Sequence, residues 1–120
     1  MLKAVARTLL VYLGYHPPGR QVRVYDDDIF LVSYPKSGST WLRFLIASLK
    51  CGHERVDFTN VDRMIPDIYQ DAEKKLQAAK RPRIIKSHEY LDPRYKKVIY
   101  IVRDPRDVAV SYYYHHVKQK

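Results

Sequence analysis

Three short runs of apolar residues, each followed by a polar turn, dominate the pattern along this chain. They cover residues 29–33, 83–87 and 97–102. The runs are nearly continuous and do not alternate with polar residues, which is typical of parallel strands that are buried on both faces. Stretches with helical character separate them. The pattern therefore predicts an α/β fold in which helices flank a parallel sheet.

The helical stretches have recognisable ends. The first runs from about 39 to 50 and stops near Gly52, and the second covers 70–79, which is rich in good helix formers and precedes Pro82. Residues 56–69 are ambiguous, and we expect a loop with a short helix around Pro66. These boundaries fit helices that connect neighbouring strands.

The last helix has the strongest start signal. Asp104 is a good N-cap, Pro105 suits the first helical position and Asp107 falls at the third. The helix should continue at least through Tyr113. The third strand, like the first, therefore leads into a helix N-terminus, so two such junctions should share the carboxyl edge of the sheet.

The N-terminal segment carries a weaker pattern. A short apolar run at 9–13 predicts a helix that ends near Gly14, with a turn at 16–19 after it. We assign residues 1–24 as an N-terminal helix and linker. No run approaches the roughly 20 apolar residues that a membrane span needs, so we expect none.

The composition limits which ligands and which kinds of site this chain is expected to have. The formal net charge is +9, which favours an anionic ligand, but the basic residues form no long block and give no evidence for nucleic acid. The single cysteine, Cys51, excludes an internal disulfide and a zinc site of several cysteines. It is consistent with a reducing compartment, so we expect a cytoplasmic location and no metal.

The most informative segment is the loop between the first strand and the first helix, residues 34–41. It reads Tyr-Pro-Lys-Ser-Gly-Ser-Thr-Trp. A helix N-terminus has unpaired N–H groups and partial positive charge, so it can bind an anion. Gly38 allows close approach of the backbone, and Lys36 adds a full charge. The remaining polar donors are Ser37, Ser39 and Thr40. We expect this loop to bind a phosphate or phosphate-like group.

Further candidates follow the other two strands. Arg103 ends the third strand and could form a forked pair with a phosphate, although an ion pair with Asp104 or Asp107 is the simpler reading. His88 ends the second strand and has a ring suited to general-base chemistry near neutral pH. The other four histidines have no comparable context. Trp41 could pack in the core or stack on an aromatic base.

Several classes of function remain open at this point. One is a P-loop kinase, against which the missing G-x-x-x-x-G-K-[ST] pattern counts. A basic nucleic-acid-binding domain is another, and it lacks a recognisable reader motif. A nucleotide-binding protein without turnover is a third.

Three motifs together resemble the sulfotransferases that use 3′-phosphoadenosine 5′-phosphosulfate (PAPS). They are P-K-S-G-S-T-W, K-S-H at a strand end, and I-V-R-D-P-R-D-V-A-V-S-Y-Y, in the family order. The resemblance covers roughly residues 29–114. It implies a three-layer fold related to the P-loop kinases, with residues 29–120 as the PAPS-binding core. It also implies a small-molecule or carbohydrate acceptor with a hydroxyl or amine group.

The resemblance also implies roles for individual residues. Lys36 would stabilise the leaving phosphate oxygen, His88 would take the acceptor's proton, and Lys86 would lie near the sulfonyl group. Trp41 would stack on the adenine. The residues implied in nucleotide binding are Lys36, Ser37, Gly38, Ser39, Thr40, Trp41, Arg103 and Ser111.

The sequence departs from the family pattern in three ways. Ser39 stands where many members have threonine, which keeps a hydroxyl. The pair Asp104-Pro105 is more like bacterial and carbohydrate-type members than the cytosolic animal enzymes. The later Gly-rich basic segment, which completes the 3′-phosphate site in the family, has no counterpart. We therefore interpret residues 1–120 as a single, partial sulfotransferase domain that should be inactive or weakly active alone.

Overall fold

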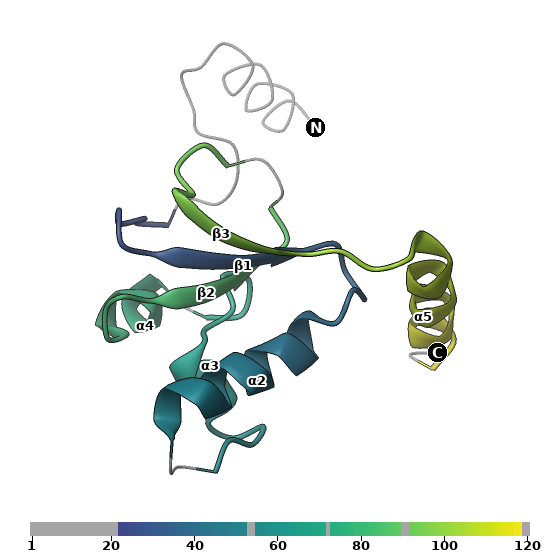
Figure 1. Ribbon diagram of the computed structural model, residues 1–120, viewed down its shortest axis with the longest axis horizontal. Helices are drawn as coiled ribbons and strands as arrows, with labels where there is room; N and C mark the ends of the chain where they lie inside the picture. Colours follow the sequence, from purple (N-terminus) through teal and green to yellow (C-terminus); the bar gives the residue numbers. More distant parts are fainter. Residues whose placement is uncertain (1–21, 53–54, 72, 90–91, 119–120) are drawn as a thin grey trace.

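The computed structural model describes residues 22–52, 55–71, 73–89 and 92–118. The helix expected at 9–13 and the turn at 16–19 lie outside these residues. A central strand, β1 (Ile29–Ser33), pairs in parallel with β2 (Ile84–Ser87) and with β3 (Lys97–Ile101), in the order β2-β1-β3 (Figure 1). The prediction of three parallel strands is confirmed, and their carboxyl ends lie at the same edge.

Four helices accompany the sheet in the described part of the chain: α2 (Ser39–Cys51), α3 (Val61–Met64), α4 (Glu73–Ala78) and α5 (Pro105–Lys118). Helix α2 ends where predicted, because Gly52 adopts a φ of 58° and donates its N–H to the carbonyl of Ser48. Helix α4 is shorter than the predicted 70–79. The predicted cap of α5 is present, since the Asp104 carboxylate accepts the backbone N–H of Arg106 at 2.9 Å.

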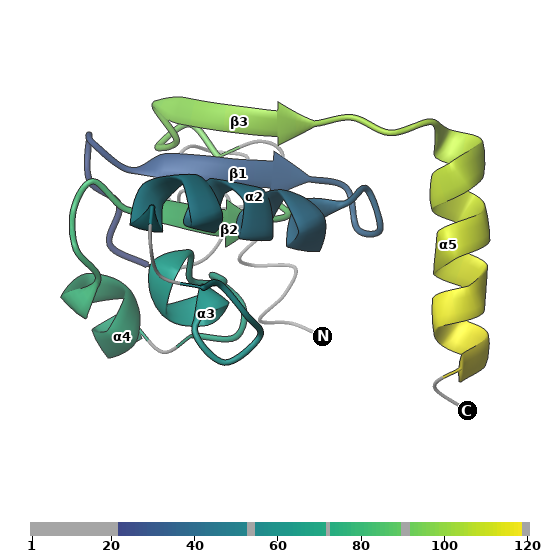
Figure 2. The ribbon, with the colours of Figure 1, turned by 60° about the horizontal axis from the view of Figure 1, so that its bottom comes forward.

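Alternate side chains of β1 enter two separate cores. Phe30 and Val32 pack with Ile68, Leu76 and Ile85 on one face of the sheet. On the other face the core consists of Leu31, Ala47, Val61, Ile65 and Ile84, from α2, α3 and the strands (Figure 2). Each fully buried apolar side chain of this size stabilises the fold by about 1.5–3 kcal/mol. The sheet is covered on both faces, so the predicted three-layer α/β arrangement is confirmed.

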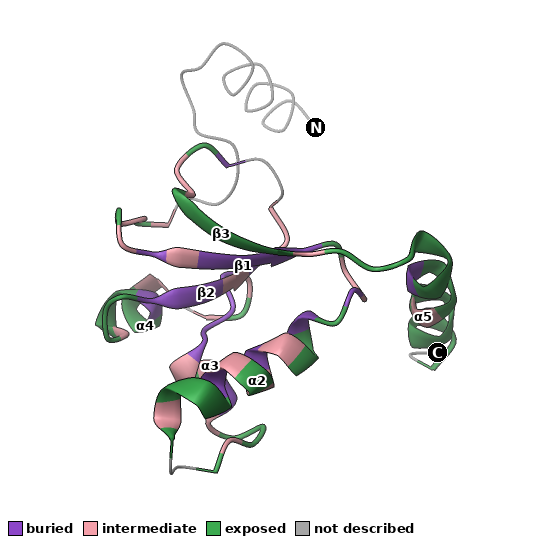
Figure 3. Cartoon of the chain, viewed as in Figure 1, coloured by how far each residue is buried: buried purple, intermediate pink, exposed green. Residues whose placement is uncertain are grey.

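The third strand does not match the sequence prediction of burial on both faces. Val98 is 48% exposed and Tyr100 is 58% exposed, whereas β1 and β2 are almost wholly buried (Figure 3). Edge position is not the reason, because β2 is also an edge strand and is buried. The difference is that α5 extends away from the sheet and does not fold back over β3 (Figures 1 and 2). An apolar run indicates a strand but not how many neighbours cover it.

A buried ion pair joins the starts of β1 and β2. Arg83 donates from Nε to Asp28 Oδ1 at 2.8 Å and from Nη1 to the carbonyl of Leu76 at 2.8 Å. The pair helps to align the two strands and attaches α4 to them. Within the described ranges, no helix has the length and apolar character needed to cross a bilayer.

Candidate active site

A pocket of about 430 Å³ lies at the carboxyl edge of the sheet and joins all three strand ends. Parallel strands deliver the residues that follow them to one edge, so side chains distant in sequence meet there. The lining residues are Pro35, Lys36, Gly38, Ser39, Thr40, Trp41, Lys86, His88, Arg103, Ser111 and His115. The pocket therefore brings together every candidate site residue from the sequence except Ser37.

The loop before α2 has the backbone geometry of a close-approach site. Lys36 has a φ of 68°, and Gly38 has a φ of 102° with open space where a Cβ would lie. The first N–H groups of an α-helix have no intrahelical acceptors, and no side chain caps those of α2, so they are available at the pocket end of the helix. The helix dipole adds partial positive charge at the same point. This end of α2 can bind an anion.

Arg103 connects the end of β3 to that loop. Its Nη1 donates to the carbonyl of Lys36 at 3.1 Å, while its Nε lies 4.0 Å from Asp107 Oδ2. The ion pair considered from the sequence exists, but it is long and exposed, and the guanidinium also lines the pocket. Asp104 pairs instead with Arg106 at 2.7 Å, which lowers the pKa of Asp104. Arg103 is therefore placed to contact a bound anion.

His88 is held in a defined orientation. Its Nδ1 lies 2.7 Å from the carbonyl oxygen of Ser33, and because a carbonyl can only accept, Nδ1 carries the proton. In the neutral ring, Nε2 is then the acceptor. The backbone N–H of His88 donates to the hydroxyl of Tyr69 at 3.1 Å, and the two rings stack with centroids 5.8 Å apart. Partial burial raises the pKa of Tyr69, so its hydroxyl stays neutral.

Lys86 has a partner that the sequence analysis did not find. Its Nζ lies 2.7 Å from Asp67 Oδ2, and the two side chains are only 12% and 2% exposed. Asp67 reaches β2 through an isolated parallel bridge to Lys86, and its Oδ1 also accepts the N–H of Tyr69 at 2.9 Å. The sequence gives no local sign of this pair, because the two residues are nineteen positions apart and meet only in the folded chain. The positive charge of Lys86 is thus largely compensated.

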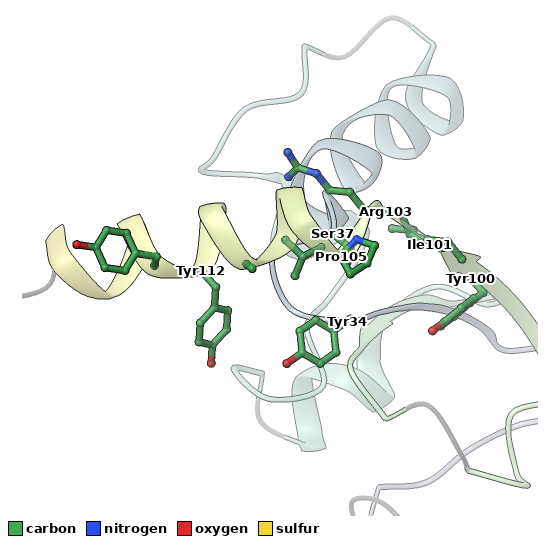
Figure 4. A pocket seen from close by; sticks show the side chains of 11 residues that line it. Tyr34, Ser37, Tyr100, Ile101, Arg103, Pro105 and Tyr112 are labelled. Atoms are coloured by element: carbon green, nitrogen blue, oxygen red, sulfur yellow. The ribbon is translucent and has the colours of Figure 1, made fainter.

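The aromatic residues divide between two sides of the chain. Trp41 is 69% exposed and lines the polar pocket, so it does not pack in the core. A larger cavity of about 630 Å³ lies between the end of β3 and α5, and Tyr34, Tyr100 and Ser37 are among its lining residues (Figure 4). Arg103 extends away from these two tyrosine rings (Figure 4). Ser37 therefore belongs to the apolar side.

His115 also lines the polar pocket, although the sequence analysis set it aside. It follows Ser111 by four residues on α5, so the two side chains share one helix face. That four-residue spacing is the sequence feature from which the position of His115 beside Ser111 could have been predicted. Among the described residues, no group of His, Cys, Asp or Glu side chains could hold a metal ion.

Comparisons with known proteins agree with the motifs. The sulfotransferase domain family matches residues 26–120. Luciferin sulfotransferase of Photinus pyralis is 29% identical over 87% of this chain and 37% of its own length. Sulfotransferase 1E1 of Cavia porcellus is 36% identical over 73% of this chain and 35% of its own. Amine sulfotransferase of Oryctolagus cuniculus is 30% identical over 76% of this chain and 34% of its own. The chain spans little more than a third of these relatives, and it belongs to the sulfotransferase domain family.

Proposed function

We propose that this chain binds PAPS and contributes to the transfer of its sulfonyl group to a hydroxyl or amine. One observation carries the proposal: the polar pocket joins the α2 N-terminus, Arg103 and His88. Transfer in line needs cationic groups beside the leaving oxygen and a base on the opposite side. The P-loop kinase and nucleic-acid alternatives have no comparable support.

The nucleotide would occupy the cationic part of the pocket. The N–H groups of α2, Lys36 and the hydroxyls of Ser39 and Thr40 would bind the 5′-phosphosulfate. Arg103 and Ser111 would hold the 3′-phosphate, and the exposed ring of Trp41 would stack on the adenine. The side chain of Ser37 lines the apolar cavity, so we do not propose that it contacts the nucleotide.

In the transfer step, His88 Nε2 takes the proton of the acceptor group. The acceptor oxygen or nitrogen forms its bond to sulfur while the bond from sulfur to the phosphate oxygen breaks. Adenosine 3′,5′-bisphosphate leaves, and Lys36 stabilises the charge that develops on its 5′-phosphate. Lys86, compensated by Asp67, would position the sulfonyl oxygens through its N–H donors and add little net charge.

The class of acceptor follows from the relatives. Two of them are named for luciferin and for amines. We propose a small molecule or carbohydrate with a hydroxyl or amine. We also propose a cytoplasmic location, which rests on the single cysteine.

Calorimetry with adenosine 3′,5′-bisphosphate and 5′-AMP, on a chain extended to the full sulfotransferase domain, tests the nucleotide site. We expect tighter binding of the bisphosphate, and Arg103→Ala should weaken it about tenfold or more, because hydrogen bonds to charged groups contribute about 1.5–3 kcal/mol. Arg106→Ala is the matched control, since Arg106 lies three residues away and does not line the pocket. Equal affinity for the two nucleotides would remove the 3′-phosphate role from Arg103.

A further inference from the structure

Residues 66–69 run beside β2 and in parallel with it, although they form a single bridge and no full strand. Asp67 makes that bridge to Lys86. The N–H of Ile68 donates to the carbonyl of Lys86 at 3.0 Å, and the N–H of Lys86 donates to the carbonyl of Pro66 at 2.9 Å. Because the pairing is parallel, this short segment ends at the same edge of the sheet as β2.

The last residue of the segment, Tyr69, is anchored at that edge. Its N–H donates to Asp67 Oδ1 at 2.9 Å, and Asp67 Oδ2 lies 2.7 Å from Lys86 Nζ. The preceding residue, Ile68, is 1% exposed in the core that contains Phe30, and the ring of Tyr69 packs against the same core. The position of this ring is therefore set both by the core and by the ion pair on β2.

His88 lies just beyond the end of the β2 ladder. The last paired residues of β1 and β2 are Val32 and Ser87, so pairing with β1 does not fix the backbone of His88. The N–H of His88 donates instead to the hydroxyl of Tyr69 at 3.1 Å. The two rings also stack, with an interplanar angle of 21° and centroids 5.8 Å apart. Tyr69 thus contacts both the backbone and the ring of the proposed base.

We propose that Tyr69 is a positioning residue for sulfonyl transfer. It holds the ring of His88 in the orientation in which Nδ1 meets the carbonyl of Ser33 and Nε2 is the proton acceptor. A general base must lie within about 2.6–3.2 Å of the atom whose proton it takes, and a misplacement of about 1 Å can cost about a hundredfold in rate. Tyr69 is not among the residues that line the polar pocket, so it acts through His88. The proposal rests on the proposed function, in which His88 is the base.

NMR of the ring nitrogens tests the orientation in the 120-residue chain, because their shifts report which nitrogen of His88 carries the proton. The signals are assigned by their absence in His88→Ala. The neutral ring should carry its proton on Nδ1 in the unsubstituted chain. Tyr69→Leu removes the hydroxyl and the stacked ring, and it should move the proton toward Nε2, as in unconstrained histidine. Tyr69→Phe keeps the ring and should give an intermediate result.

Tyr95→Phe is the matched control. It removes a hydroxyl from the same edge of the sheet, where Tyr95 Oη lies 3.2 Å from Ser87 Oγ, one residue before His88. The ring nitrogens of His88 should be unchanged in this variant. If Tyr69→Leu does not fold, as circular dichroism would show, Tyr69→Phe carries the test, because its side chain has nearly the same volume.

Transfer is measured in a chain extended to the full sulfotransferase domain, with labelled PAPS and a hydroxyl acceptor. Tyr69→Leu should lower kcat about a hundredfold, and Tyr69→Phe about fivefold, the effect of one neutral hydrogen bond. The KM for PAPS should stay unchanged. In the His88→Ala background neither substitution should lower transfer further, because the ring through which Tyr69 acts is missing.

The outcomes separate this proposal from the proposed function. Unchanged ring nitrogens in both Tyr69 variants overturn the positioning role, and so does a loss of transfer that is equal with and without His88. Near-normal transfer in His88→Ala alone refutes the proposed base, and the role of Tyr69 in transfer with it. A loss that depends on His88, together with the shift of the ring proton, supports both proposals.

Discussion

The ion pair between Lys86 and Asp67 gives the sharpest test of how the pocket wall is built. Lys86→Met removes the ammonium and leaves the carboxylate of Asp67, only 2% exposed, without its cationic partner. Breaking a buried pair in this way costs about 3–5 kcal/mol. Two features favour the lower end: Lys86 is 12% exposed, and Asp67 keeps the N–H of Tyr69 at 2.9 Å. We expect a loss of about 3 kcal/mol in the free energy of unfolding.

Asp67→Asn should cost less, about 1–2 kcal/mol, because asparagine still accepts the N–H of Tyr69 and Lys86 can reach water through the pocket. The double variant removes both charges together. Since neither charge is then left buried alone, the two losses should not add, and the coupling should be about 2 kcal/mol.

Urea unfolding of the chain and the three variants, followed by circular dichroism, measures these values. Bisphosphate calorimetry on Lys86→Met adds a check, because a charge compensated by Asp67 should affect stability more than nucleotide affinity. Strict additivity of the two single losses would refute the reasoning. A loss below about 0.5 kcal/mol for Lys86→Met would do so as well, because it would show that Asp67 finds another partner.

Three further predictions concern the same core and pocket. In a chain extended to the full sulfotransferase domain, His88→Ala should reduce sulfonyl transfer from labelled PAPS by about 10²–10⁴ and leave bisphosphate affinity unchanged, and near-normal transfer would make His88 structural. Lys36→Gly should be about 1 kcal/mol more stable than Lys36→Gln, because position 36 has a φ of 68°, which glycine adopts without strain. Both variants should weaken bisphosphate binding. Equal urea midpoints for the two variants would contradict the difference in stability. Tyr95, whose pKa burial raises to about 12, should ionise last, so stability falls between about pH 10 and 12 as the unfolded chain loses that proton first. Tyr95→Phe should show a smaller fall, because the pKa of Tyr69 is raised as well, and ultraviolet titration should lack one late tyrosine.

The sequence predicted the parallel sheet and its site edge because those features depend on local signals. The three apolar runs, the glycine at 38 and the Asp104 cap each act within a few residues. Parallel pairing then brings Lys36, His88 and Arg103 to one edge without any further information. The strand ends and the edge that carries the candidate site therefore follow from local sequence.

What the sequence did not predict depends on contacts across the fold. The partner of Lys86 comes from a segment, 56–69, whose structure the pattern left ambiguous. The carbonyl of Ser33 selects the tautomer of His88, although the two residues are 55 positions apart. The exposure of β3 depends on which elements lie beside it. Ser37 lines the apolar cavity, and the positive φ of Lys36 just before it is not a conformation that a lysine indicates in a sequence.

The open edge of β3 has a consequence for the chemistry of the site. No strand among the described residues pairs with its outer edge, and its side chains Val98, Ile99 and Tyr100 are exposed. Any strand that adds there in parallel brings its own carboxyl end to the edge that holds Lys36 and Arg103. The residue after that strand would then lie at the same edge as the proposed nucleotide site, so strand addition is a way to bring a further side chain to that edge. The same exposed edge is also a place where a second copy of the chain can pair by strand addition.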